Sequence, residues 1–158
     1  MTILDLTKSI DEVQEVEALI EDYYLMRISG EPTIEPNKKK KDGVSAEEGG
    51  GDNYIIRMVV QSDRPEYHGR MFTIWLEIPN AADATRIMGN GQSHEDRKIE
   101  KVRKVAEAFN GGPLDPATTA FDFQAGMEAM FYVDRVPAGV GFENPLLDFD
   151  NHPPQPAM

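Results

Sequence analysis

The fold is decided by the stretch YIIRMVVQSDRPEYHGRMFTIWLEI, residues 54–78, which holds two alternating apolar runs around a polar turn. This pattern predicts a β-hairpin whose turn spans residues 62–69. Because successive side chains of a strand point to opposite faces, each strand is expected to bury one row of side chains and to expose the other. The rows expected in the core are Tyr54, Ile56, Met58 and Val60 on the first strand and Phe72, Ile74, Leu76 and Ile78 on the second.

The opposite face of this hairpin carries Arg57 and Trp75, the only tryptophan of the chain. A sheet that buries one face and shows aromatic and cationic side chains on the other can serve as a stacking platform for nucleic-acid bases. An aromatic residue on a strand more often has a packing role, so Trp75 could instead cover the outer edge of the sheet or form a dimer contact. The sequence leaves both interpretations open.

Three further strands and one helix are predicted around the hairpin. Residues 22–29 and 127–136 alternate in the same way, and residues 142–147 form a short edge strand because Pro145 cannot donate to a ladder. The helix begins at Ser93, with Asp96 three residues on as in a capping box, and ends at the Asn110-Gly111-Gly112-Pro113 stop. Its apolar stripe is expected to be Ile99, Val102, Ala106 and Phe109, while Arg97, Lys98, Lys101 and Lys104 favour a solvated face over a DNA contact.

The predicted order is strand, long loop, two-stranded hairpin, helix, strand, short turn, strand. This is the connectivity of a mainly β, five-stranded OB-fold barrel, with its helix between strands 3 and 4 and its long loop between strands 1 and 2. Another small α+β sheet fits the same spacing. The domain is expected to span residues 22–147, after a lead-in of residues 1–21 and before a tail of residues 148–158 that cannot pack and is disordered.

The long loop, residues 30–53, is rich in Gly, Pro, Lys and Glu and is expected to be mobile. It contains the densest positive charge of the chain, the run Lys38, Lys39, Lys40 and Lys41. A loop of this length inside a domain is usually either functional or disordered, and the lysine run is either a phosphate-binding arm or a solvated charge run.

Composition limits the classes of function. The 158 residues make one domain, and the absence of cysteine excludes disulfides and thiolate metal sites. Neither a signal peptide nor a membrane-length apolar run is found, so a cytoplasmic protein with no membrane partner is expected. The 28 acidic residues outnumber the 16 Lys and Arg, which gives a formal charge of −12 that repels nucleic acid unless a groove is locally basic.

No catalytic or cofactor signature is found in the chain. His68, His94 and His152 stand alone, without a second ligand at metal spacing. No glycine run ends as a phosphate-binding loop does, and no nucleophile elbow is present. We therefore expect no enzyme and no cofactor.

Five phrases carry a resemblance to a known family: DLTKSIDEV, DYYLMRISG, EYHGRMFTIWLEI, KIEKVRKVAEAFNGG and FQAGMEAMFYVDR. Over most of residues 5–147 the chain resembles the OB-fold single-stranded-DNA-binding proteins of tailed bacteriophages, which are often encoded among replication and recombination genes. Asp22 stands where that family has a glycine, and Asp148-Phe149-Asp150 is at best a remnant of the acidic tail that recruits partner proteins.

The resemblance implies sequence-independent binding of single-stranded DNA in phage replication, recombination or repair, in the host cytoplasm. Replication or recombination proteins and a second copy of the chain are then possible partners. Phosphates are expected to contact Arg27, Arg57, Arg70 and the lysine run Lys38, Lys39, Lys40 and Lys41, and bases to stack on Trp75, Tyr23 and Tyr132. The alternative, which the charge of −12 favours, is a non-enzymatic structural or interaction protein, such as a virion component or an acidic inhibitor that mimics DNA.

Overall fold

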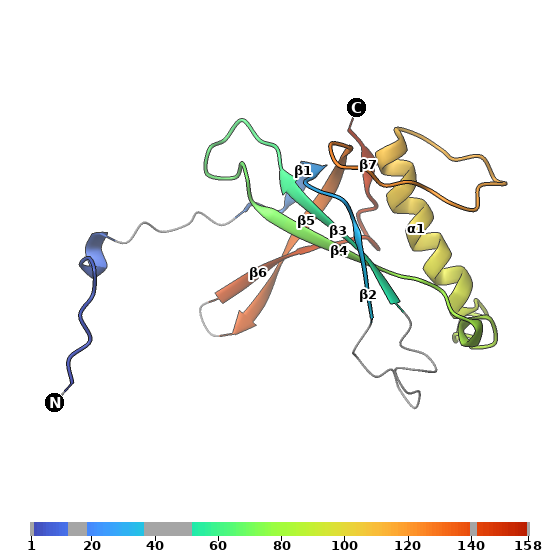
Figure 1. Cartoon of the computed structure of the whole chain (residues 1–158), viewed down its shortest axis with the longest axis horizontal. Helices are drawn as coiled ribbons and strands as arrows, with labels where there is room; N and C mark the ends of the chain where they lie inside the picture. The colour runs from blue at the N-terminus through green and yellow to red at the C-terminus, as the bar shows by residue number, and fades with distance from the viewer. Residues whose placement is uncertain (1, 13–18, 37–51, 140–141, 158) are drawn as a thin grey trace.

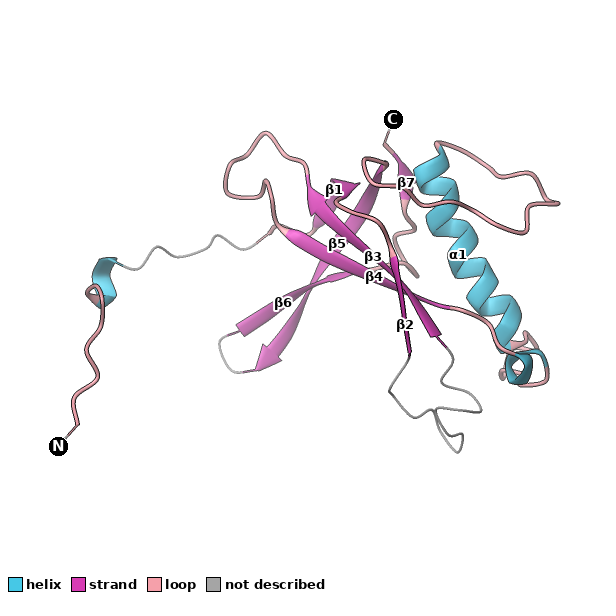
Figure 2. Ribbon diagram, in the orientation of Figure 1, coloured by secondary structure: helices cyan, strands magenta, loops and turns pink. Residues whose placement is uncertain are grey.

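The computed structural model describes residues 2–12, 19–36, 52–139 and 142–157, of which residues 135–139 and 142–146 are described by their backbone only. The described elements are seven strands, one α-helix and two 3₁₀ turns (Figures 1 and 2). They are η1 (Ile10–Glu12), β1 (Asp22–Ile28), β2 (Thr33–Pro36), β3 (Asp52–Val60), β4 (Met71–Glu77), η3 (Ala81–Ala84), α1 (His94–Asn110), β5 (Glu128–Gly139), β6 (Phe142–Leu147) and β7 (Gln155–Pro156).

All the described strands belong to one antiparallel sheet, in which five strands follow the order β2-β3-β1-β5-β6. In addition, β4 pairs with β3, and β7 pairs with β5. The sheet is strongly twisted, so that the β3–β4 hairpin crosses β5 and β6 in Figure 1. The expectation of a mainly β protein with one helix between the hairpin and the next strand is confirmed.

The sheet is not closed, so the predicted barrel is not confirmed. Among the described residues β4 pairs only with β3 and β6 only with β5, and no ladder joins these two end strands. The free edge of β4 faces α1, where Lys101 donates to the carbonyl oxygen of Trp75 at 3.5 Å. Side chains of the helix therefore stand where a closing strand would have to pair.

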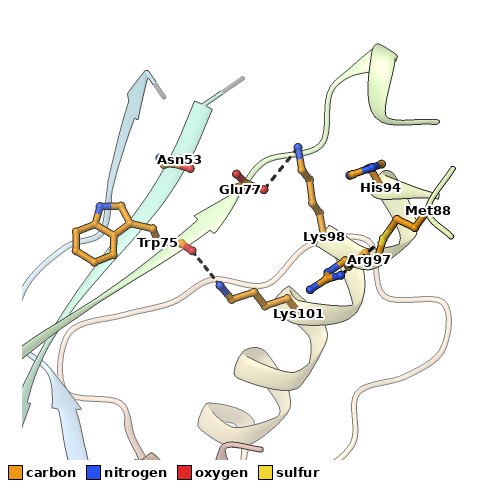
Figure 3. A pocket seen from close by; sticks show the side chains of 8 residues that line it. All are labelled: Asn53, Trp75, Glu77, Met88, His94, Arg97, Lys98 and Lys101. Carbon is orange, nitrogen blue, oxygen red and sulfur yellow. Dashed lines mark hydrogen bonds and ion pairs between the residues drawn. The ribbon is translucent and has the colours of Figure 1, made fainter. Parts of the chain in front are cut away.

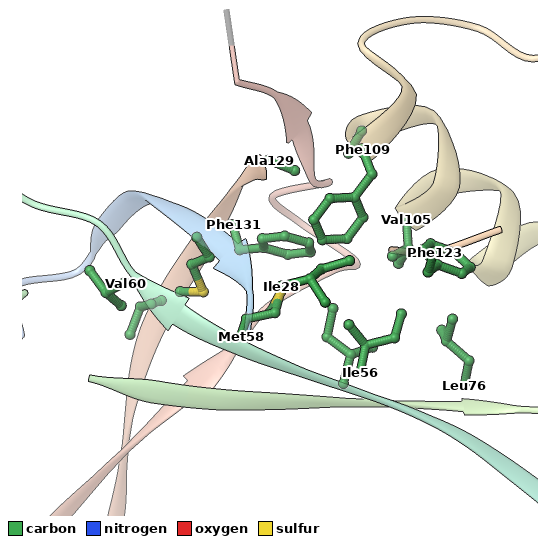
Figure 4. Close-up of a cluster of buried hydrophobic side chains, with 14 of the residues drawn as sticks. Ile28, Ile56, Met58, Val60, Leu76, Val105, Phe109, Phe123, Ala129 and Phe131 are labelled. Carbon is green, nitrogen blue, oxygen red and sulfur yellow. The ribbon is translucent and has the colours of Figure 1, made fainter. Parts of the chain in front are cut away.

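The core lies between the inner face of the sheet and α1 (Figure 4). The inner row of the hairpin is as predicted, with Ile56, Met58, Val60, Ile74 and Leu76 at most 2% exposed. The helix adds Val105 and Phe109, whose ring centroid lies 5.5 Å from that of Phe131 on β5. One position of the predicted helical stripe is wrong, because Ile99 is 51% exposed and its neighbour Lys98 is buried instead.

Both ends of α1 follow from the sequence. Ser93 accepts a hydrogen bond from the backbone N–H of Asp96 at 3.0 Å, which satisfies one of the unpaired donors of the first turn. Gly111 ends the helix with φ of 82°, a left-handed conformation that glycine adopts without steric cost.

The predicted loop and tail both need correction. Part of the loop forms β2, which pairs with the start of β3, while residues 37–51 and with them the run Lys38 to Lys41 lie outside the described residues. The prediction that the tail cannot pack is wrong for residues 148–157. Phe149 lies 6.1 Å from Phe131, and β7 pairs with Ala129 and Met130 of β5, because β6 leaves that part of the β5 edge unpaired. No helix in the described part of the chain is both long and apolar enough to cross a lipid bilayer.

Candidate nucleic-acid interface

The face of the sheet that points away from the core is the outer face. Strand register arranges it in rows that run across the strands. Thr33, Ile55 and Trp75 share one row, Arg57 and Thr73 the next, and Arg27, Val59, Met71 and Glu128 a third, while Tyr23 and Tyr132 pair near the far end. Five of the predicted contact residues, Tyr23, Arg27, Arg57, Trp75 and Tyr132, are therefore on one face.

Trp75 is both packed and exposed. Its side chain points opposite to those of Ile74 and Leu76, as predicted, and it is 55% exposed. Its cross-strand partner is Ile55, whereas Arg57 lies opposite Thr73. Ile55 is only 3% exposed although it lies outside the main core cluster, so its neighbours Trp75 and Thr33 cover it. Part of the indole packs on the sheet and the rest is free to contact a ligand.

Two arginines of the outer face have only weak carboxylate partners. Arg57 lies 3.9 Å from Glu35 and also donates to the hydroxyl of Thr33 at 3.2 Å. Arg27 lies 3.4 Å from Glu128. Exposed pairs of this kind contribute between zero and about 1 kcal/mol, so a phosphate group can replace the carboxylate at low cost.

Tyr23 and Tyr132 meet at the far end of the outer face but are covered by the tail. The two rings contact edge to face, with centroids 5.3 Å apart. His152 stacks on Tyr132 at 3.7 Å with an interplanar angle of 10°, and the Tyr23 hydroxyl donates to the carbonyl of Pro153 at 3.0 Å. The sequence missed this contact because the tail lacks a strand or helix pattern.

Acidic groups surround this end of the face. The pKa of Tyr132 is raised above its ordinary value, first by desolvation and then by the charges of Glu21, Asp134, Asp22 and Asp148. A phosphate group near Tyr132 would meet the same negative potential.

Arg70 lies away from the outer face. Its Nε atom donates to the carbonyl of Glu66 at 3.1 Å, and its guanidinium lies 5.7 Å from the ring centroid of Tyr67. Tyr67 is buried in the core, so Arg70 belongs to the hairpin turn on the core side. The structure does not bring it together with Arg27 and Arg57.

A cleft of about 780 Å³ lies between the free edge of β4 and α1 (Figure 3). Its lining residues are Asn53, Trp75, Glu77, Met88, His94, Arg97, Lys98 and Lys101. In Figure 3 the carbonyl of Trp75 points toward Lys101 while its indole points away from the helix. Trp75 therefore stands at the border between this cleft and the outer face.

The three cations of the cleft differ in their partners. Lys98 is neutralised, because its ammonium lies 2.8 Å from the buried carboxylate of Asp83 and 3.8 Å from that of Glu77. Arg97 and Lys101 form no ion pair with a carboxylate within the described part of the chain. Arg97 donates to the sulfur of Met88 at 3.7 Å, and the ammonium of Lys101 lies 5.1 Å from the ring of Phe149.

Lys101 also shows an electrostatic perturbation. Its pKa is lowered, first because its ammonium is desolvated and also because Arg97 is near, while the charges of Glu77 and Asp150 act in the opposite direction. Lys101 is nevertheless an exposed residue, so its side chain is accessible to an anionic ligand. The sequence favoured a solvated face here, and only the packing of α1 beside β4 brings this face to the cleft.

The buried pair of Asp83 and Lys98 fixes the position of the helix. Asp83 takes part in a reciprocal capping box at the start of η3. Its carboxylate accepts from the backbone N–H of Asn80 at 2.9 Å, and its own backbone N–H donates to the Asn80 side-chain oxygen at 3.1 Å. The same carboxylate accepts from Lys98 of α1. One acidic side chain thus joins the connection after β4 to the helix.

Within the ranges that the structure describes, no group of three or more His, Cys, Asp or Glu side chains is placed to hold a metal ion. Comparison with protein-family models, with curated proteins and with solved structures gave no match. The resemblance to phage single-stranded-DNA-binding proteins accordingly stays a prediction.

Proposed function

We propose that the chain binds single-stranded DNA without sequence preference, in the replication, recombination or repair of phage DNA. The observation that carries the proposal is the exposed indole of Trp75, on the outer face of a sheet and at the border of a cleft whose far wall bears Arg97 and Lys101. Aromatic stacking beside a cationic groove is the usual means of binding a single strand. In a chain with a net charge of −12, two neighbouring cations that form no ion pair within the described residues support binding of an anion at this place.

A polymer fits this surface better than a mononucleotide. The register puts Arg57 two residues and Arg27 four residues along the strands from the Trp75 row, and four residues correspond to about 13 Å along the sheet surface. A ligand that contacted Trp75 and both arginines would have to extend beyond a single nucleotide.

We also propose that the sheet and the helix form an OB fold. The support is the pairing of β1 with both β3 and β5, the β3–β4 hairpin, and the helix between β4 and β5. OB-fold barrels are partly open, which is compatible with the free edges of β4 and β6. The oligonucleotide-binding surface of that fold includes its second and third strands, which would be β3 and β4 here.

A protein-binding surface is the second candidate. Met71 is 70% exposed on the same face as Trp75, and an apolar patch of this kind can contact a protein as well as a base. The arginines of the outer face are also paired with carboxylates, which favours a neutral partner over a polyanion. This candidate requires no nucleic acid.

Mobility of a labelled oligo(dT) in a native gel separates the two candidates. Binding is expected without metal or nucleotide and should weaken as salt rises, because released counterions supply part of the affinity. The absence of a shift at about 10 μM protein in low salt would contradict the proposal, since non-specific binders usually associate in that range. Self-association in the same sample, measured by sedimentation, would then favour the protein-binding surface.

A further inference from the structure

We infer that the cleft between β4 and α1 is a phosphate-binding site, in which Arg97 and Lys101 hold the anion. The phosphate can come from a bound strand or from a free nucleotide. In the first case the inference rests on the function proposed above, and in the second it stands without it.

The two cations are placed to act on one group. They are four residues apart on α1, so they lie on the same side of the helix, about 5 to 6 Å apart at their Cβ atoms. Both line the cleft. A phosphate with several acceptor oxygens can therefore receive hydrogen bonds from the guanidinium and the ammonium together.

The protein leaves these cations without a strong partner. Their contacts are a thioether sulfur for Arg97, and a carbonyl at 3.5 Å and an aromatic ring for Lys101, none of which carries a negative charge. The carboxylate in the cleft lining, Glu77, is in an ion pair with Lys98 at 3.8 Å, while Asp150 and Glu100 act on Lys101 and Arg97 from outside the lining. Lys98 is therefore occupied, and the anion is expected on the side of the cleft where Arg97 and Lys101 lie.

The rest of the lining suits the remainder of a nucleotide. Asn53, which pairs with Glu77 across the β3–β4 ladder, has a buried amide oxygen for which the described residues offer no hydrogen-bond donor. A sugar hydroxyl or a base N–H can supply that donor. The indole of Trp75 begins where the cleft meets the outer face, so a base attached to the bound phosphate can reach it. A volume of about 780 Å³ is in the range of small-molecule sites.

The test compares two double variants with the wild-type chain. Arg97→Gln with Lys101→Gln removes both cations of the cleft. Arg103→Gln with Lys8→Gln is the matched control, because it removes the same two kinds of charge at exposed positions outside the cleft lining. Thermal unfolding establishes that both variants remain folded. The probes are inorganic pyrophosphate, dTMP and oligo(dT), with binding measured by calorimetry and by the fluorescence of Trp75.

The cleft variant is expected to bind at least one probe at least about tenfold more weakly than wild type, because each hydrogen bond to a charged group accounts for roughly that factor. The control should change by less than about threefold, as expected for distant surface charges. An effect on pyrophosphate and dTMP identifies a free-nucleotide site. An effect confined to oligo(dT), with a shallower salt dependence, identifies a strand phosphate.

Equal affinities of the two variants for all three probes, or no binding of any probe by the wild type, would overturn the inference. Failure of the proposed function gives a different result. In that case oligo(dT) does not bind wild type, while pyrophosphate binds in a manner that depends on Arg97 and Lys101.

Discussion

The two aromatic ends of the outer face differ in what surrounds them. At one end Trp75 is 55% exposed and borders the cleft that holds Arg97 and Lys101. At the other end the imidazole of His152 stacks on the ring of Tyr132, and the pKa of Tyr132 is raised by desolvation and then by nearby carboxylates. An aromatic side chain on an exposed face therefore does not by itself mark a base-binding position. The groups that already cover the ring and the charge around it decide whether a nucleotide can bind.

This difference makes the electrostatic potential of the outer face unequal at its two ends. A polyanion is attracted to the Trp75 end and repelled from the Tyr132 end, because potentials add over the charges of each region. The strongly negative net charge thus does not exclude nucleic acid from the whole surface. We expect the first contacts of a strand at Trp75, and this asymmetry between the two ends of the outer face can be measured.

The largest effect is expected from Lys98→Ala, which removes the ammonium that lies 2.8 Å from the buried carboxylate of Asp83. Breaking a buried pair in this way costs about 3 to 5 kcal/mol of unfolding free energy. Urea denaturation followed by Trp75 fluorescence measures the loss. The double variant Lys98→Met with Asp83→Asn should recover much of it. A loss below about 1 kcal/mol, the usual value of a surface pair, would mean that the pair does not fix α1 beside β4.

A smaller effect separates the two aromatic ends directly. Trp75→Leu keeps an apolar cover over Ile55 but removes the ring, so it should weaken oligo(dT) binding by about 1 to 3 kcal/mol with only a small loss of stability. Tyr132→Leu should change the affinity by less than about 1 kcal/mol, because His152 already occupies its ring. Fluorescence anisotropy with the labelled oligonucleotide measures both. Equal losses for the two variants would remove the proposed asymmetry.

The smallest effect is expected from the contact between Asp148 and His152, the residue that covers Tyr132. This contact should make the stability of the protein depend on pH. The pKa of Asp148 is lowered, first by the hydrogen bond from His152 at 2.9 Å, which offsets the opposing effect of desolvation. A carboxyl with a lowered folded-state pKa stabilises the protein above its unfolded pKa, and this contribution disappears as the pH falls through the folded value. Asp148→Asn should cost less than about 1 kcal/mol at neutral pH. Melting curves of variant and wild type are expected to converge in acid, and a constant difference down to low pH would contradict this.

Much of the local structure was predictable because it depends on near neighbours in the sequence. Alternation placed Ile74 and Leu76 in the core and Trp75 on the opposite face, and Ser93 and Gly111 fixed the ends of the helix. The helical stripe failed at one position, where Lys98 is buried and Ile99 exposed. That exchange depends on Asp83, which reaches Lys98 from outside the helix and supplies the charge that makes burial of a lysine possible.

The candidate site likewise combines features that were predictable from the sequence with features that were not. The residues of each strand that share the outer face were predictable, since the period of a strand requires no information about its partners. The folded chain was needed to show that Trp75 pairs with Ile55, that Arg97 and Lys101 line a cleft at the β4 edge, and that His152 covers Tyr132. These contacts join segments far apart in the chain, and they depend on strand register and on the packing of whole elements, which no local pattern of residues encodes.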